Sequence, residues 1–246
     1  VALGLFPVLN DPPLAEKNNN HPLFEPFESI LKCDIITFHV PLEKNPPYPT
    51  YHLANEHFFN EIKPGTVLIN SSRGSVVETS ALLKAIEQGI VSHSIIDVWE
   101  NEPNISIDLL KKVTIGTPHI AGYSFDGKVN GTYQLYIALC RSLNRAPSWD
   151  YRNNLPEPPI KELQISPDDP NPLYTAVHQL YNITSDDKAL REIENKKADE
   201  RGAYFDLLRK NYPKRREFHN TTVRLIQKNQ TLANKFECLG FKLAKD

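Results

Sequence analysis

Short apolar runs alternate with amphipathic stretches along the first 145 residues of the chain. Runs of this kind predict buried strands, at 5–10, 34–38, 66–70, 94–98 and 113–115. The other stretches carry apolar residues at helical spacing, which predicts helices at 27–32, 55–62, 79–88, 108–112 and 126–144. Strands that alternate with helices predict an α/β fold with a doubly wound, Rossmann-like parallel sheet.

The pattern changes after residue 145, where prolines interrupt regular structure at 147, 156, 158, 159, 167, 170 and 172. Beyond them, strands are predicted at 163–165 and 222–226, and helices at 173–181, 186–194, 203–212 and 231–239. We therefore expect two domains. Residues 1–145 form part of a dinucleotide-binding and catalytic domain, and 146–246 form a proline-rich strap with a small C-terminal α/β domain.

The composition of the chain excludes several classes of protein function. The net charge is -2, so no global basic field attracts nucleic acid or anionic membrane. No apolar run approaches the roughly 20 residues that span a bilayer. The three cysteines lie far apart and form no CxxC pair, which favours a reducing cytoplasm and gives no metal site.

The chain begins at Val1 and contains no methionine, so we expect that a preceding region is missing from this sequence. The G-x-G-x-x-G loop of a dinucleotide fold does not occur in it. We expect the sheet to be incomplete at its N-terminus and the fragment to lack activity alone.

Three ionisable residues follow the central apolar runs: Arg73, Glu102 and His119. The carboxyl ends of parallel strands meet at one edge of a sheet, where ligands bind. Oxidation of a 2-hydroxy acid needs a base of near-neutral pKa, which favours histidine, and a carboxylate can orient that imidazole. A guanidinium can hold the substrate carboxylate. Each residue alone has an ordinary structural interpretation, but the ordered set favours a site.

Two other strand-end residues remain open to both interpretations. Asp11 can bind the ribose hydroxyls of a dinucleotide, or it can be a turn aspartate before proline, which is favoured in isolation. His39 is favoured as a packed histidine over a ligand contact. The basic run at 210–218 is favoured as a solvated or intersubunit surface over a phosphate site.

The segments NSSRG, DVWENEP and TPHIAG resemble the signature segments of the D-isomer-specific 2-hydroxyacid dehydrogenases. The resemblance covers residues 1 to about 145. It implies that Arg73, Glu102 and His119 are catalytic and that Asp11 and Asp97 contact the dinucleotide. A carboxylate at Asp11 favours NAD, because it repels the additional phosphate of NADP.

One branch of this family is resembled more closely, through CDIITFHVPL, KKVTIGTPHIAGYSFDGKVNGT and LRKNYPKRREF. This closer resemblance implies NAD-dependent oxidation of 4-phospho-D-erythronate to its 2-oxo acid, in pyridoxal 5′-phosphate biosynthesis. It also implies that Val40 and Gly122 contact the cofactor, that Tyr123 contacts the substrate and that the C-terminal domain forms a homodimer. Val40 departs from the pattern, since a hydroxyl residue is common there.

Two alternatives stay open. The first is a dehydrogenase for another D-2-hydroxy acid such as phosphoglycerate, which the C-terminal module disfavours. The second is a non-catalytic NAD-sensing interaction protein. It is disfavoured because binding alone does not require an acid-base pair.

Overall fold

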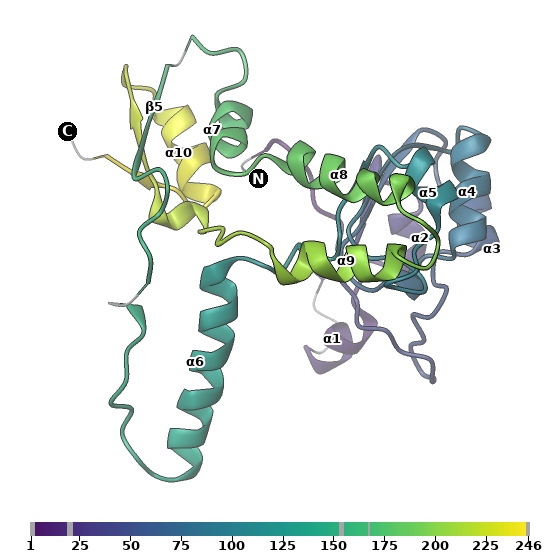
Figure 1. The fold of residues 1–246 in the computed structure, drawn as a ribbon, viewed down its shortest axis with the longest axis horizontal. Coiled ribbons are helices and arrows are strands. Elements are labelled where there is room, and N and C mark those ends of the chain that lie inside the picture. The colour runs from purple at the N-terminus through teal and green to yellow at the C-terminus, as the bar shows by residue number, and fades with distance from the viewer. Residues whose placement is uncertain (1–2, 19–21, 153–154, 167, 245–246) are drawn as a thin grey trace. The chain divides into compact units, whose positions relative to one another are not determined.

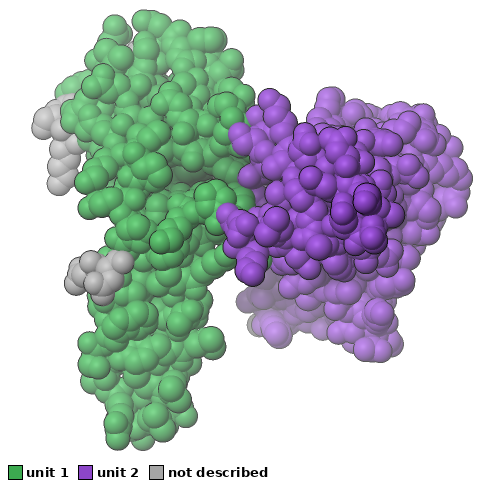
Figure 2. Space-filling view, viewed as in Figure 1, with its two compact units in different colours: residues 1–5, 122–183, 212–246 green, residues 6–121, 184–211 purple. Residues whose placement is uncertain are grey.

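The computed structural model describes residues 3–18, 22–152, 155–166 and 168–244. The chain divides into two compact units (Figure 2). Unit 2 comprises residues 6–121 and 184–211, and unit 1 comprises 1–5, 122–183 and 212–246. The boundary expected at residue 145 falls inside unit 1, because the long helix that precedes it belongs with the C-terminal residues.

Unit 2 is built on a parallel sheet of β1 (Ile35–Phe38), β2 (Thr66–Asn70), β3 (Val91–Ile96) and β4 (Ile115–Gly116). The strands lie side by side in chain order, and each pairs in parallel with the next. All four carboxyl ends therefore point to one edge. The expected α/β fold with a parallel, Rossmann-like sheet is confirmed.

Two short helices precede the sheet, α1 (Pro12–Lys17) and α2 (Phe27–Ile30). Three others connect its strands: α3 (Glu56–Glu61), α4 (Thr79–Glu87) and α5 (Ile107–Lys112). The side chain of Asn55 accepts from the backbone N–H of Phe58 and so starts α3. Helices α3 and α4 lie side by side (Figure 1). Their apolar faces and the sheet share one core, in which Leu68, Leu82 and Leu110 are completely buried.

Most of α8 (Ile183–Arg191), together with η3 (Glu192–Asn195) and α9 (Arg201–Lys210), belongs to unit 2 although it comes late in the chain. The Arg191 guanidinium donates to the carbonyls of Leu110 (2.8 Å) and Val113 (3.0 Å). Asp187 accepts from the N–H of Gly116 at 2.7 Å. Leu190, Ile193 and Phe205 are fully buried in the same core. These helices thus complete the unit that carries β4.

Unit 1 contains the long helix α6 (Phe125–Ser142) and a second parallel sheet, of β5 (Glu162–Ile165), β6 (Thr222–Leu225) and β7 (Lys242–Leu243). Helices α7 (Pro172–Leu180) and α10 (Gln230–Cys238) accompany this sheet. Its own small core includes Leu163, Ile165, Val223 and Phe236.

Two expectations from the sequence need correction. The strand expected at 5–10 is wrong, because that segment forms a single bridge, between Leu9 and Phe24, and leaves Phe6 almost fully exposed. An apolar run becomes a strand only where a neighbouring strand receives its hydrogen bonds. Strand β3 begins at Val91 and ends at Ile96, earlier than expected.

No helix among the described residues is long and apolar enough to cross a membrane.

Candidate active site

The segments after β3 and β4 bring Glu102 and His119 into direct contact. His119 Nδ1 lies 2.7 Å from Glu102 Oε2. The other oxygen of Glu102 accepts from the backbone N–H of Trp99, also at 2.7 Å. The side chains keep 31% and 20% of their surface exposed, for His119 and Glu102 respectively. The carboxylate is therefore fixed by the protein while the imidazole stays open to a small molecule.

Asp97 holds the segment that carries His119. Its carboxylate is buried and accepts from the Thr117 hydroxyl (2.6 Å) and from the N–H groups of Ile120 (2.8 Å) and Ala121 (3.0 Å). Its carbonyl accepts from the N–H of His119. These bonds fix His119 in a left-handed backbone conformation, with φ 55°, that few non-glycine residues adopt. The contact of Asp97 with a dinucleotide stays a prediction.

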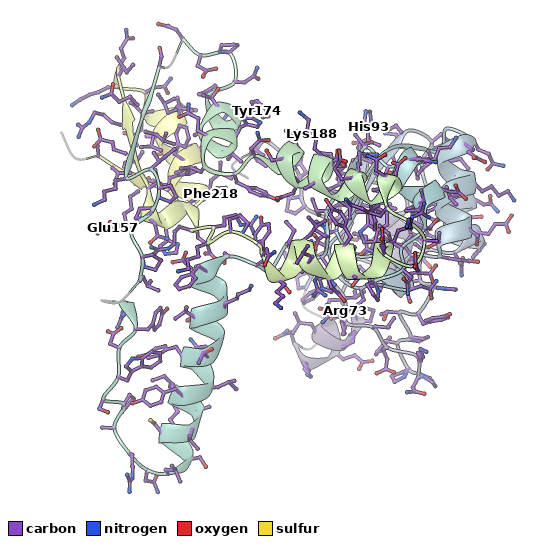
Figure 3. The ribbon with its side chains drawn as sticks, in the orientation of Figure 1. Arg73, His93, Glu157, Tyr174, Lys188 and Phe218 are labelled. Atoms are coloured by element: carbon purple, nitrogen blue, oxygen red, sulfur yellow. The ribbon has the colours of Figure 1, made fainter. Side chains whose placement is uncertain are left out.

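The segment after β2 presents Arg73 at the protein surface (Figure 3). The buried Asn70 side chain accepts from the N–H of Ser72 and donates to the carbonyl of Arg73. Arg73 itself donates to the Ser72 carbonyl at 2.7 Å. A Cβ atom on Gly74 would lie 2.0 Å from the carbonyl oxygen of Trp99. Glycine at this position therefore lets the Arg73 segment pack against the turn that carries Glu102.

A cavity of about 540 Å³ lies in unit 2 beside the start of the chain and the proline-rich segment 43–50. Asp11, His39 and Val40 line it together. Asp11 also caps α1, with Oδ1 accepting from the N–H of Leu14 at 2.9 Å. The expectation that His39 is packed is wrong: it is exposed, and its Nε2 meets the Thr37 hydroxyl at 2.9 Å. The cofactor roles of Asp11 and Val40 stay predictions.

Gly122 and Tyr123 lie in unit 1, so their roles in cofactor and substrate binding also stay predictions. Within that unit the Tyr123 ring meets the Tyr212 ring edge-on at 5.9 Å. The Lys128 ammonium lies 3.6 Å from the centre of the Tyr123 ring.

One contact was not expected from the sequence. His52 Nε2 lies 2.7 Å from Glu100 Oε1, and the second oxygen of Glu100 accepts from the N–H of Thr79 at 2.7 Å. Burial raises the pKa of Glu100, but the hydrogen bonds from Thr79 and His52 outweigh it and leave the pKa below its usual value. The only signal in the sequence is a carboxylate at both 100 and 102.

Comparison with known proteins identifies the family of residues 8–121, the larger part of unit 2. A model described as the NAD binding domain of D-isomer specific 2-hydroxyacid dehydrogenases matches residues 8–121. These residues belong to that family. Arg73, Asp97, Glu102 and His119 all fall inside the matched range. A domain of unknown function matches residues 154–240, which the structure divides between both units.

Individual relatives match over most of the chain. A Bacteroides fragilis protein named erythronate-4-phosphate dehydrogenase is 46% identical over 216 residues, covering 87% of this chain and 58% of the relative. Proteins of the same name from Cellvibrio japonicus and Escherichia coli are each 40% identical, covering 94% and 90% of this chain and 62% and 58% of themselves. The chain thus spans about three fifths of the length of the curated relatives that it matches.

Proposed function

We propose that the protein oxidises 4-phospho-D-erythronate to (R)-3-hydroxy-2-oxo-4-phosphooxybutanoate with NAD. The observation that carries this proposal is the contact between His119 and Glu102, in a domain of the D-isomer specific 2-hydroxyacid dehydrogenase family. The relatives named erythronate-4-phosphate dehydrogenase support the choice of substrate. That name also supports a place in pyridoxal 5′-phosphate biosynthesis.

His119 is the base in this proposal. With its Nδ1–H donated to Glu102, the imidazole presents the lone pair of Nε2. Nε2 takes the proton of the C2 hydroxyl as the C2–H bond breaks. The Glu102 carboxylate holds the required tautomer and stabilises the imidazolium that forms. In the reverse direction the same nitrogen returns the proton to the carbonyl oxygen.

Arg73 holds the substrate carboxylate through two parallel hydrogen bonds. Its exposure supports this role, and its segment packs against the turn that carries Glu102. Bound NAD would supply the acceptor for the hydride from C2. The cavity lined by Asp11 and Val40 is the proposed place for the dinucleotide. The family pattern gives Asp97 and Gly122 a role in cofactor binding and Tyr123 a role in substrate binding.

A homodimer formed through unit 1, with its long helix α6, is part of the proposal. Leu135 and Leu139 in the C-terminal half of α6 and Leu143 at its C-cap recur every fourth residue, and they are 74%, 57% and 58% exposed. A row of exposed leucines supports a protein interface. The free thiols of Cys33, Cys140 and Cys238 support a reducing, cytoplasmic location.

The test is NADH formation by the intact enzyme from 4-phospho-D-erythronate and from 3-phosphoglycerate, with His119→Ala alongside. We expect turnover of the first substrate to exceed that of the second. We also expect His119→Ala to lower kcat by about 10²- to 10⁴-fold while the Kd for NAD, measured by calorimetry, stays unchanged. Faster turnover of phosphoglycerate would make phosphoglycerate the proposed substrate instead. NAD binding without turnover of any 2-hydroxy acid would overturn the proposed dehydrogenase activity.

A further inference from the structure

One turn of unit 2, residues 99–102, supplies the carboxylates of two histidine–carboxylate pairs. Glu102 contacts His119 and Glu100 contacts His52, each at 2.7 Å. A single residue, Asn101, separates the two carboxylates, and its φ of 59° lies in the left-handed region. A residue in that conformation needs surrounding contacts to hold it. The turn is thus held at one end by its pair with His52 and meets the proposed base at the other.

Glu100 joins three segments of the chain. Besides His52, it accepts from the N–H of Thr79, the first residue of α4. Glu78 precedes that helix and makes no side-chain cap bond, so Glu100 supplies the cap from a distant segment. The Glu100 side chain is 16% exposed and the His52 side chain is 27% exposed. A pair shielded to this degree is screened less by solvent than a surface ion pair.

His52 lies in the segment that carries two lining residues of the cavity of about 540 Å³, Thr50 and Leu53. His52 has φ 50°, its N–H donates to the carbonyl of Ser75 at 2.8 Å, and the Tyr51 ring stacks on its imidazole with 4.0 Å between centres. The imidazole is therefore held by the Tyr51 ring as well as by Glu100, next to the cavity-lining residue Leu53.

We propose that His52 and Glu100 are a positioning pair, which ties the cavity wall to the turn that carries Glu102. The pair keeps the Glu102 carboxylate on Nδ1 of His119. The effect of the pair on kcat rests on the proposed function. The effect of the pair on the structure, a fixed proton position on the His119 ring, is independent of the proposed function. A pair that only caps α4 would change stability and leave the His119 ring unaffected.

Three variants separate these possibilities. His52→Ala removes the pair. His52→Gln places an amide nitrogen close to the position of Nε2 and should restore the contact with Glu100. Glu100→Gln keeps an oxygen for the Thr79 N–H and removes the charge that faces His52. The matched control is Lys84→Ala in α4, the helix that Glu100 caps, which breaks the exposed ion pair of Lys84 with Glu56 of α3.

Two measurements on the intact enzyme form the test. Heteronuclear NMR reports which nitrogen of the His119 ring carries the proton, and steady-state kinetics give kcat and KM. We expect His52→Ala and Glu100→Gln to lose the single Nδ1–H tautomer of His119 and to lower kcat by about 10- to 100-fold, because small misplacements of a catalytic group have effects of that size. His52→Gln should recover most of both, and Lys84→Ala should change neither.

Each outcome decides something. An unchanged His119 tautomer and unchanged kcat in His52→Ala, with a lower Tm, would overturn the positioning role. A changed tautomer in a protein that does not turn over its proposed substrate would uphold the pair and overturn the proposed function. If His52→Ala does not fold, Glu100→Gln gives the same two measurements with the start of α4 still capped.

Discussion

The two sheets of this chain have the same construction and different edges. In both, parallel strands lie side by side in chain order. At the carboxyl edge of unit 2, Asp97, Glu100 and Glu102 accept hydrogen bonds across separate segments of the chain or bind a distant histidine. After β5 in unit 1, the polar side chains bond locally: Ser166 accepts from the N–H of Asp168, and Asp169 from that of Asn171.

This difference shows that a parallel sheet supplies an edge but not a site. Local turn bonds hold one loop in its own shape and place nothing relative to the next loop. Carboxylates that bridge separate loops fix them together. Where such a carboxylate is buried, as Asp97 is, the burial of its charge is unfavourable unless it is fully hydrogen-bonded. Unit 2 carries such bridges at its edge, which supports the proposed catalytic site there.

The largest expected effect is at Asp97. Asp97→Ala removes a buried acceptor of three hydrogen bonds and leaves their donors unsatisfied. We expect the free energy of unfolding to fall by about 3–5 kcal/mol, measured by urea denaturation. The matched variant in the other sheet, Ser166→Ala, should change it by no more than about 0.5 kcal/mol. Equal losses at both positions would break the distinction between the two edges.

The buried carboxylate of unit 1 lies away from its sheet edge, at the start of α6. Asp126 accepts two hydrogen bonds from Arg216, at 2.9 and 3.0 Å, and others from the Glu217 N–H and the Asn220 amide. Asp126→Asn leaves the Arg216 charge buried without its partner. We expect a loss of about 3 kcal/mol in the free energy of unfolding at neutral pH.

The free energy of unfolding measured at low pH checks this second prediction. Burial raises the pKa of Asp126. Arg216 and the hydrogen bonds lower this pKa by a larger amount, so the folded pKa lies below the usual 3.8. The stability that Asp126 contributes is thus complete above pH 3.8 and is lost as the pH falls through the lower folded value. Wild type and Asp126→Asn should converge in acid. A difference that stays constant down to the lowest pH would contradict this account.

The third prediction concerns the close approach at Gly74. In Gly74→Ala the added Cβ meets the backbone of Trp99, which no side-chain rotation can relieve. We expect a loss of about 2 kcal/mol in stability and a lower kcat, because the segments carrying Arg73 and Glu102 must separate. The control is Gly131→Ala in α6, where a Cβ meets nothing within 4 Å and should stabilise the helix by about 0.5–1 kcal/mol. Opposite signs support the packing role of Gly74.

Sequence patterns predicted the elements of both sheets better than they predicted the contacts between them. Apolar spacing found β2, α4 and α6, because burial of one face is a local property of the pattern. The same spacing could not tell that α9 joins the core of unit 2, since any core covers an apolar face equally well. The family motifs identified Glu102 and His119 as candidate site residues. The contacts of His52 with Glu100 and of Gly74 with Trp99 join positions far apart in sequence, and no spacing records them.

The smallest expected effect is at an ion pair across strands of unit 1. Arg224 on β6 binds Glu162 on β5 through two hydrogen bonds, at 2.8 and 3.1 Å, yet the side chains are 48% and 42% exposed. Solvent screens such a pair, and ordering two long side chains opposes it. A double-mutant cycle of Arg224→Ala and Glu162→Ala should give a coupling energy near zero, whereas Asp97→Ala with Thr117→Val should couple measurably. If the exposed pair couples as strongly as the buried one, burial is not what separates the two edges.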